Sequence, residues 1–471
     1  MYLGLDLGTS GLKALLVGAG QRSQVEANAP LSVDRPKPGW SEQDPDSWIA
    51  ACRAALAQLG DLSKVRAVGL SGQMHGATLV DAGGASLRPC LLWNDTRAHA
   101  EAAEMDDAEA RRITGNIVFP GFTAPKVEWV RRHEPEVFAR TARVLLPKDY
   151  LRLWLTGSAW TDMSDAAGTA WLDVGARDWS DALLARSGLG RDHMPALAEG
   201  SAVAGRVSAA CAAATGLPEG IPVAGGGGDN AASAVGTGAV SPGRGFVSLG
   251  TSGVLFVSCA AYRPDAASAV HTFCHAVPDT WHQMGVILSA TDSLEWAARL
   301  TGRPAAELAG RPLSPPGRTL FLPYLGGERT PHNDAAARGA LLGVEHATDA
   351  AALGRAVMEG VAYAFADCHA ALRATGSPID RLLAVGGGSR SDAWLGMIAT
   401  LTGLPLELPE DGAYGGALGA ARLAMMADGA GPEIAATPPI ARVVAPDAAL
   451  ADAFAEGHAR YRAAYTATKE F

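Results

Sequence analysis

The sequence predicts an α/β protein whose two related domains enclose a central cleft. The chain has 471 residues, and one hydrophobic core stops growing at roughly 250–300 residues, so at least two domains are expected. The pentapeptide Leu-Gly-Thr-Ser-Gly occurs twice, at 7–11 and at 249–253. Each copy lies between apolar runs, which is the pattern of two antiparallel strands joined by a tight turn. Such a unit in each half of the chain predicts two domains of related build.

Composition narrows the class of function. The formal net charge is −10, which disfavours a general role on nucleic acids or membrane surfaces. The six cysteines include no Cys-x-x-Cys pair, so we expect reduced thiols and a cytoplasmic location. No uncharged run reaches the roughly 18 residues of a membrane span. The expected partners are therefore small molecules, and a homodimer remains possible.

The first turn, at 8–11, is predicted to cradle a phosphate group. Its glycines, Gly8 among them, allow close approach of the backbone, while Thr9 and Ser10 offer hydroxyl and N–H donors to an anion. Asp6 ends the preceding strand, where a carboxylate would repel a bare phosphate but suits a hydrated Mg²⁺ bound to one. An ordinary glycine-rich hairpin is the alternative for this segment taken alone.

The first half continues with the alternating elements of an α/β sheet. Asp44 is expected to cap a helix that has proline in its first position. Residues 99–215 are interpreted as an insertion into the first domain. The expected strands are 24–30, 65–70, 78–80 and 222–224, and the expected helices are 45–59, 124–133, 148–155, 180–187 and 231–235.

Two polar clusters follow predicted elements of this half. Gln73, Met74 and His75 come directly after the strand 65–70, and residues past a strand's carboxyl end point into the ligand crevice of such a sheet. An apolar wall from Met74 with donors from Gln73 and His75 indicates a small polyol site.

The second cluster combines an aromatic ring, an amide, a carboxylate and a guanidinium, a mixture that binds sugars. We predict sugar contacts from Trp93, Asn94 and Arg97. Asp95 is left open between a ligand role and capping of the helix expected from Ala98 onward.

Four glycines at 225–228 lead into Asp229 and Asn230 at the start of a small-residue helix. A glycine run lets backbone lie close to a ligand. Asp229 is the candidate general base, and Asn230 beside it a candidate sugar contact; the alternative is that Asp229 only caps the helix. The crossing between the domains is expected at 237–243.

The second half repeats the design. Gly250 and Thr251 form its phosphate turn, and a long helix is expected at 349–374. The strand 381–385 ends in glycines that include Gly387 and Gly388, the form of a nucleotide-facing turn, and a helix follows to about Leu401. The glycines at 412, 415, 416 and 419 are interpreted as turn and helix-packing residues.

The sequence disfavours a zinc site and a P-loop nucleotide site. His271 and His275 have a metal-like spacing, but the sequence offers no third ligand and the segment reads as extended, so zinc is not expected. The phosphate-binding motif Gly-x-x-x-x-Gly-Lys-Ser/Thr is absent from the sequence.

Together these motifs resemble the FGGY carbohydrate kinases, a branch of the superfamily with an actin-like, RNase H-like ATPase fold. The resemblance runs from Tyr2 to about Ala424. Its segments are 4–11, 71–76, 93–97, 120–126, 146–150, 164–169, 226–232, 326–333 and 386–388.

The resemblance implies a sugar-binding domain at 1–238 and a nucleotide-binding domain at 239–471. It implies ATP and Mg²⁺ as cofactors, and transfer of the γ-phosphoryl group to the C5 hydroxyl of D-xylulose. Ribulose, glycerol and gluconate are the alternative acceptors, and a nucleotide-switched ATPase without a sugar substrate is the alternative class.

The resemblance also assigns roles to residues. Asp229 is the implied catalytic base, and Met74 and His75 contact the ketose. Gly387 and Gly388 lie against the adenosine, and Asp392 stands where related kinases often place an Asn beside the adenine. The residues implied to hold the phosphates are Thr9, Ser10, Lys13 and Thr251, with Asp6 orienting the hydrated metal ion.

Overall fold

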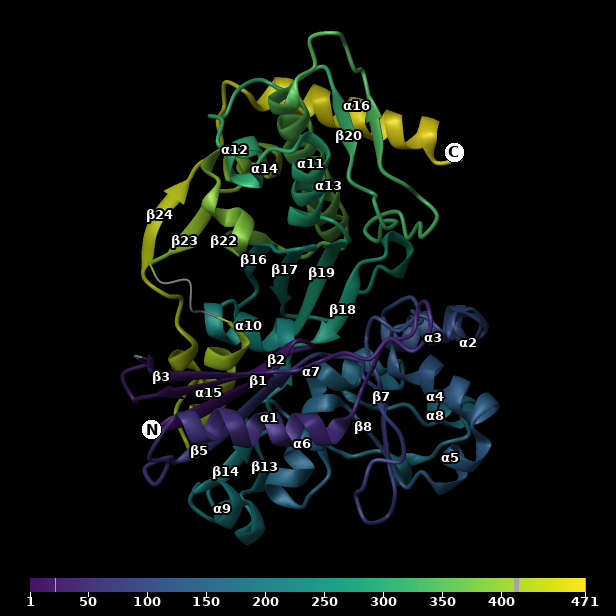
Figure 1. The fold of residues 1–471 in the computed structure, drawn as a ribbon, viewed down its shortest axis with the longest axis vertical. Coiled ribbons are helices and arrows are strands. Elements are labelled where there is room, and N and C mark those ends of the chain that lie inside the picture. Colours follow the sequence, from purple (N-terminus) through teal and green to yellow (C-terminus); the bar gives the residue numbers. More distant parts are fainter. Residues whose placement is uncertain (22, 411–414, 471) are drawn as a thin grey trace.

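Two seven-stranded sheets form the centres of the two halves of the protein (Figure 1). The computed structural model describes residues 1–21, 23–410 and 415–470. The first sheet has the order β13-β14-β5-β1-β2-β3, with β15 also paired to β5. Its strands are β1 Tyr2–Leu7, β2 Gly11–Val17, β3 Ser23–Pro30, β5 Ala67–Gly72, β13 Val203–Arg206, β14 Pro222–Ala224 and β15 Gly227–Gly228.

The second sheet has the order β18-β19-β17-β16-β22-β23-β24. Its strands are β16 Gly243–Leu249, β17 Gly253–Cys259, β18 His271–Cys274, β19 Trp281–Ile287, β22 Ile379–Val385, β23 Leu406–Pro409 and β24 Ile440–Val444. The remaining short strands are β4 Glu42–Gln43, β6 Thr78–Val80, β7 Cys90–Leu91, β8 Arg143–Leu145, β9 Trp160–Asp162, β10 Leu172–Asp173, β11 Asp178–Trp179, β12 Ala196–Ala198, β20 Leu320–Leu322 and β21 Ala340–Leu342.

The two sheets share one connectivity. In the first, β1 pairs antiparallel with β2 and parallel with β5; in the second, β16 pairs antiparallel with β17 and parallel with β22. The next strand outward is antiparallel in both sheets, β3 beside β2 and β19 beside β17. The repeated pentapeptide forms the turn of each central hairpin, which confirms the prediction of two related α/β units around the hairpins.

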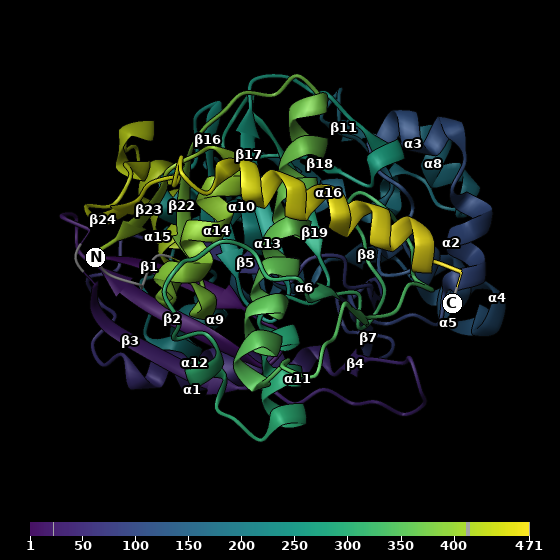
Figure 2. The same cartoon turned by 90° about the horizontal axis from the view of Figure 1, so that it is seen from above.

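The helices agree with the sequence pattern. Asp44 caps α1 by accepting a hydrogen bond from the Asp46 N–H at 3.0 Å. The longest helix, α13, lies beneath the C-terminal α16 in the view of Figure 2. The α-helices are α1 Pro45–Gln58, α2 His99–Met105, α3 Ala108–Thr114, α4 Thr123–His133, α5 Pro135–Arg140, α6 Pro147–Thr156, α7 Met163–Ala166, α8 Asp181–Arg186, α9 Ala209–Thr215, α10 Asp229–Thr237, α11 Thr291–Thr301, α12 Ala305–Leu308, α13 Ala350–Ala374, α14 Asp392–Thr402, α15 Gly416–Ala427 and α16 Ala451–Thr468.

Helix α15 belongs to the second half of the sequence but packs on the first sheet and on α10 (Figure 1). Glycines make this contact possible, because a Cβ on Gly4 of β1 would lie 1.9 Å from the Ala417 carbonyl oxygen. A Cβ on Gly419 would lie 1.7 Å from the Ala232 carbonyl oxygen of α10. Backbone therefore meets backbone, and the start of α15 is brought to the carboxyl end of β1.

The boundary at 238/239 stays a prediction, since α15 returns to the first sheet and β13 falls inside the stretch interpreted as an insertion. Gly412 lies outside the described residues. All six cysteines are buried and unpaired. None of the helices in the described part of the chain is long and apolar enough to cross a membrane.

Candidate active site

Asp229 is the first residue of α10, directly after the glycine run. Gly228 occupies the N-cap position, so Asp229 does not cap the helix as the alternative interpretation required. Its Oδ1 accepts hydrogen bonds from the backbone N–H of Asn230 at 2.7 Å and from Asn230 Nδ2 at 3.0 Å. Burial, opposed by the bonds from Asn230 and reinforced by the charge of Asp6, raises the pKa of Asp229 to about 6. A carboxylate that titrates near neutral pH suits a general base.

Asp6, near the end of β1, is close enough to Asp229 for its charge to raise the pKa of Asp229. Ser71 Oγ donates to Asp6 Oδ1 at 2.8 Å, and a Cβ on Gly416 would lie 2.8 Å from the Asp6 carboxyl carbon, so the carboxylate faces the first turn of α15. Burial raises the pKa of Asp6, against the opposing effects of Ser71 and Lys13. Burial therefore destabilises the charged form of each carboxylate, and a cation between or beside the two would reduce this destabilisation.

These two carboxylates fit a magnesium ion, which prefers oxygen ligands and keeps several waters. No group of three or more His, Cys, Asp or Glu side chains that could hold a metal occurs among the described residues. The two carboxylates therefore fit a hydrated ion whose remaining ligands are water and phosphate. They do not fit an ion that is coordinated by protein side chains alone. His271 lies in the strand β18, in keeping with the extended segment that argued against zinc.

The first turn has one hydroxyl engaged and one exposed. Thr9 Oγ1 donates to Gln73 Oε1 and accepts from Trp93 Nε1, each at 3.0 Å, whereas Ser10 is exposed. The Thr9 side chain therefore ties the turn to the two polar clusters. Lys13 forms an ion pair with Glu26 at 3.0 Å, so its predicted contact with phosphate requires that pair to open.

The cluster after β5 divides into structural and ligand-facing side chains. The Gln73 amide is engaged with Thr9 and, through Nε2, with Gln43 Oε1 at 3.0 Å, and its contact with sugar stays a prediction. Met74 lies against the glycine before Asp229, since a Cβ on Gly228 would lie 2.8 Å from the Met74 sulfur. His75 follows with a φ of 70°, a strained backbone for a residue other than glycine.

His75 presents one nitrogen for a ligand. Its Nδ1 lies 2.7 Å from the Gly168 carbonyl oxygen, and its ring stacks on Phe122 with centroids 4.6 Å apart. Burial lowers the pKa of His75 to about 3, so the ring is neutral at physiological pH. Because a carbonyl oxygen only accepts, Nδ1 carries the proton and Nε2 is left as an acceptor for a hydroxyl.

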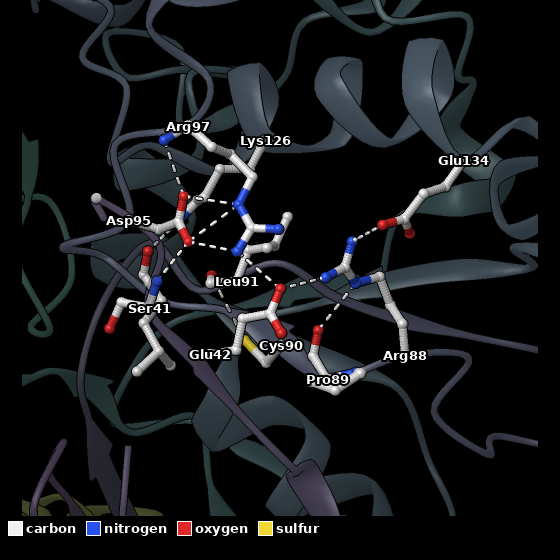
Figure 3. Close-up of polar contacts among 12 residues, drawn as sticks. Ser41, Glu42, Arg88, Pro89, Cys90, Leu91, Asp95, Arg97, Lys126 and Glu134 are labelled. Carbon is white, nitrogen blue, oxygen red and sulfur yellow. Dashed lines mark hydrogen bonds and ion pairs between the residues drawn. The ribbon is translucent and has the colours of Figure 1, made fainter. Parts of the chain in front are cut away.

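The loop 92–97 is fixed by a network of buried charges (Figure 3). The Arg97 guanidinium donates to Asp95 and pairs with Glu42 at 2.7 Å, and it lies 3.5 Å from the centre of the Trp40 ring. Its side chain is only 1% exposed. Glu42 also pairs with Arg88 at 2.6 Å. Arg97 thus holds the loop in place, and its contact with sugar stays a prediction.

The open question on Asp95 is resolved by the same network. Asp95 accepts hydrogen bonds from Arg97 and from the Ser41 N–H at 2.7 Å (Figure 3). Helix α2 begins at His99 without a side-chain cap. Capping by Asp95 is therefore wrong, and the residue is the counter-ion of Arg97. From this loop Trp93, which is 49% exposed, and Asn94 remain available to a ligand. Asn94 Oδ1 is buried without a hydrogen-bond partner in the described part of the chain.

The predicted nucleotide residues line a cavity in the second half. Its volume is about 880 Å³, within the usual range for cofactor sites. Gly387, Gly388 and Asp392 contribute to the lining, together with Thr291 at the start of α11. Asp392 is largely exposed and pairs with Arg442 at 2.5 Å.

The second phosphate turn is joined to this cavity. The Gly250 carbonyl accepts hydrogen bonds from the Thr291 N–H at 2.9 Å and from its hydroxyl at 2.8 Å, and the Thr251 carbonyl accepts from the Ala290 N–H at 2.8 Å. Thr291 therefore connects the turn with the cavity. Thr291 is not recognisable from the sequence, because a threonine beginning a helix carries no distinctive pattern.

A buried charge cluster behind the glycine run was also missed. Lys148 Nζ lies 2.6, 2.8 and 3.0 Å from carboxylate oxygens of Asp149, Asp162 and Asp165, and all four side chains are fully buried. Burial would lower the pKa of Lys148, but the three carboxylates raise it overall. Burial raises the pKa of Asp165, with Lys148 opposing. From the sequence, the segment 146–150 was recognised only as part of the family resemblance. The charged residues within its predicted helix were the signal that could have indicated a buried charge cluster.

This cluster supports the loop that carries Asp229. Arg152, also fully buried, donates to the Gly225 carbonyl oxygen at 2.6 Å. Ser164 Oγ, which is bonded to Asp162, accepts from the Gly228 N–H at 3.1 Å. One end of the glycine run is thereby anchored to the charge of Arg152, and the other end is linked through Ser164 to Asp162, which pairs with Lys148.

Comparisons with known proteins give a consistent result. The model for the FGGY family of carbohydrate kinases, N-terminal domain, matches residues 1–236, and the model for its C-terminal domain matches 245–427. A xylulose kinase of Escherichia coli strain K12 is 49% identical over 91% of this chain and 90% of its own length. A xylulose kinase of Bacillus subtilis strain 168 is 38% identical over 91% and 88%.

Solved structures agree with these relatives. A "xyloylose kinase" from Brucella ovis superposes with a TM-score of 0.97 at 56% identity, covering 100% of this chain and 99% of the other. A glycerol kinase from Plasmodium falciparum has a TM-score of 0.90 at 18% identity over 99% and 97%, and this match shows the shared fold alone.

Proposed function

The chain belongs to the FGGY family of carbohydrate kinases, and on that premise we propose that it transfers the γ-phosphoryl group of ATP to the C5 hydroxyl of D-xylulose. The products are D-xylulose 5-phosphate and ADP. The relatives named as xylulose kinases support the choice of acceptor. The reduced, buried cysteines support a cytoplasmic location.

The observation that carries the proposal is the environment of Asp229. Its carboxylate is oriented by Asn230, and its pKa is raised to about 6 by burial and by Asp6. Met74 packs against the preceding glycine, and because His75 directly follows Met74, this contact supports a sugar site that includes both His75 and the base. Such a carboxylate can take a proton from a sugar hydroxyl at neutral pH.

The reaction then follows phosphoryl-transfer chemistry. Asp229 accepts the proton of the C5 hydroxyl while that oxygen forms a bond to the γ-phosphorus, and the bond from phosphorus to the leaving ADP oxygen breaks in line. His75 Nε2 accepts a hydrogen bond from another sugar hydroxyl. Asp6 would hold a hydrated magnesium ion, which would neutralise charge on the phosphates.

The glycine-rich turns and the cavity at Gly387 and Gly388 account for the nucleotide side of the proposal. The turn at 250–253 is fixed to α11 by Thr291, which also borders the cavity. A phosphate bound at the turn and a nucleoside in the cavity thereby share one wall. Water must be excluded when the sites fill, because it competes with the sugar as acceptor.

An acceptor panel tests this function. ADP release is measured with ATP and Mg²⁺ against D-xylulose, ribulose, glycerol and gluconate, and the position of the phosphate in the product is determined by nuclear magnetic resonance. D-Xylulose is expected to have at least a tenfold higher kcat/KM than the others, a difference of about 1.4 kcal/mol. A higher kcat/KM for another acceptor, or phosphate at a position other than C5, overturns the proposal.

A further inference from the structure

We propose that Arg329 is a specificity-determining residue that binds the C2 carbonyl oxygen of the ketose. The inference rests on the proposed function and extends it to the far end of the sugar. Arg329 comes from the second half of the chain, in the loop between β20 and β21. On this assignment the sugar site is built from His75 of the first half and Arg329 of the second.

Arg329 lies in the same aromatic cluster as His75. Its guanidinium carbon is 4.0 Å from the centre of the Phe119 ring, and Phe119 contacts Phe122 with centroids 5.6 Å apart. Phe122 in turn stacks on His75 at 4.6 Å. Burial lowers the pKa of His75, the bond to Gly168 opposes this, and the charges of Lys126 and Arg329 lower the pKa further. Phe119 and Phe122 therefore link Arg329 and His75 in one cluster of rings.

The guanidinium is held from both halves of the protein. Arg329 Nη1 donates to His271 Nε2 at 3.1 Å, and His271 Nδ1 lies 3.1 Å from Asn116 Oδ1. The backbone N–H of Arg329 donates to Glu328 Oε1 at 2.7 Å, and the same oxygen accepts from the Leu288 N–H at 3.0 Å. Such support fixes a long side chain in one orientation, as recognition of a ligand requires.

Donors remain free on this fixed group. Nη1 is bonded to His271, and no hydrogen bond from Nε or Nη2 occurs among the described residues. Arg329 is only partly buried, whereas Phe119, Phe122 and His271 are buried. A partly exposed guanidinium with unused N–H groups, on a wall of buried rings, presents hydrogen-bond donors to a ligand.

The chemistry of the wall favours a carbonyl over a hydroxyl. Arginine only donates, and a carbonyl oxygen only accepts, so a ketose C2 oxygen is satisfied by Arg329. A C2 hydroxyl would accept equally well but must also place its own proton. Both nitrogens of His271 are already engaged, and the phenyl rings offer no acceptor. His75 Nε2 is an acceptor, but it is already assigned to another sugar hydroxyl. The proton of a C2 hydroxyl is then left unpaired, at a cost that corresponds to roughly fivefold to 150-fold in kcat/KM.

The test compares D-xylulose with xylitol, which differs by reduction of C2 to an alcohol. Arg329→Met keeps a flexible apolar chain over Phe119 and removes every donor. We expect its kcat/KM for D-xylulose to fall at least tenfold and that for xylitol to fall less than threefold, with the KM for ATP unchanged. Arg329→Lys keeps the charge but offers a compact donor, and its preference is expected to lie between the two. Arg338→Met, on an exposed arginine of the same loop, is the matched control and should keep the wild-type ratio.

The outcomes separate the two proposals. An unchanged ratio of D-xylulose to xylitol in Arg329→Met or Arg329→Lys, with wild-type activity on D-xylulose intact, refutes the role of Arg329 alone. An equal loss on both acceptors, or the same collapse in Arg338→Met, also refutes it. A wild-type protein that does not phosphorylate D-xylulose refutes the proposed function and this inference with it. Isothermal titration of D-xylulose into each folded variant, without ATP, gives the binding loss independently of turnover.

Discussion

Replacing Asp229 by asparagine should inactivate the enzyme and stabilise its fold at neutral pH. The raised pKa means that the charged form of Asp229 is held at a cost. The pKa is displaced from its ordinary 3.8 to about 6, and at about 1.4 kcal/mol per unit this corresponds to a cost of about 3 kcal/mol at pH 7.5. Asparagine accepts the same hydrogen bonds from Asn230 without the charge.

The stabilisation should depend on pH in one direction. Between pH 3.8 and about 6 the folded state binds more protons than the unfolded state, so the stability of the wild type falls as the pH rises through this window. Well above pH 6 Asp229 is charged in both states, and the wild type bears the full destabilisation of about 3 kcal/mol. The difference in unfolding free energy between Asp229→Asn and wild type should therefore grow by about 1.4 kcal/mol from pH 5 to pH 7.5.

Urea unfolding at the two pH values measures this difference, and the ADP-release assay measures the rate. The loss of a general base should lower kcat by roughly 10²–10⁴-fold. Asp392→Asn is the matched control, because Asp392 is also the first residue of a helix but its side chain is 71% exposed. It should change stability by less than about 1 kcal/mol. A folded Asp229→Asn with near-normal kcat, or with lower stability than wild type at pH 7.5, would falsify the reasoning.

Three further substitutions test other parts of the site. Asp6→Asn should raise the Mg²⁺ concentration for half-maximal rate severalfold with little change in the KM for D-xylulose; an equal change in both points to a structural role. His75→Ala should lower kcat/KM for D-xylulose roughly tenfold or more while basal ATP hydrolysis persists, and unchanged ketose kinetics contradict the assignment. Lys148→Met should cost about 3–5 kcal/mol in urea unfolding, because it leaves buried carboxylates without their cation; a loss under 1 kcal/mol contradicts that.

Local patterns predicted the framework of the site well. The hairpins at 7–11 and 249–253 were recognisable because period-two hydrophobicity on both sides of a glycine-bounded turn specifies antiparallel strands without distant contacts. The position of Asp229 after a strand and a glycine run also followed from local order. These features depend on residues that are neighbours in the sequence.

Roles that depend on distant partners were not predictable. Arg97 was predicted to contact the sugar. The sequence did not show that the pairing of β4 with β7 brings Glu42 alongside, where it forms an ion pair with the Arg97 guanidinium. Thr9 was predicted to hold phosphate, but the sequence did not show that its hydroxyl accepts a hydrogen bond from Trp93 Nε1. A sequence shows which groups can pair and not which partner folding places nearest. The contact of α15 with the first sheet escaped prediction for the same reason, since it joins residues about 400 positions apart.

The most direct test of the central claim is a crystal structure of the protein with D-xylulose and a non-hydrolysable ATP analogue. A general base must lie within about 2.6–3.2 Å of the oxygen whose proton it takes. We predict this distance between the Asp229 carboxylate and the C5 hydroxyl oxygen, with the γ-phosphorus of the analogue on the opposite side of that oxygen. A sugar bound with C5 away from Asp229, or with another side chain at that distance from the C5 oxygen, contradicts the account.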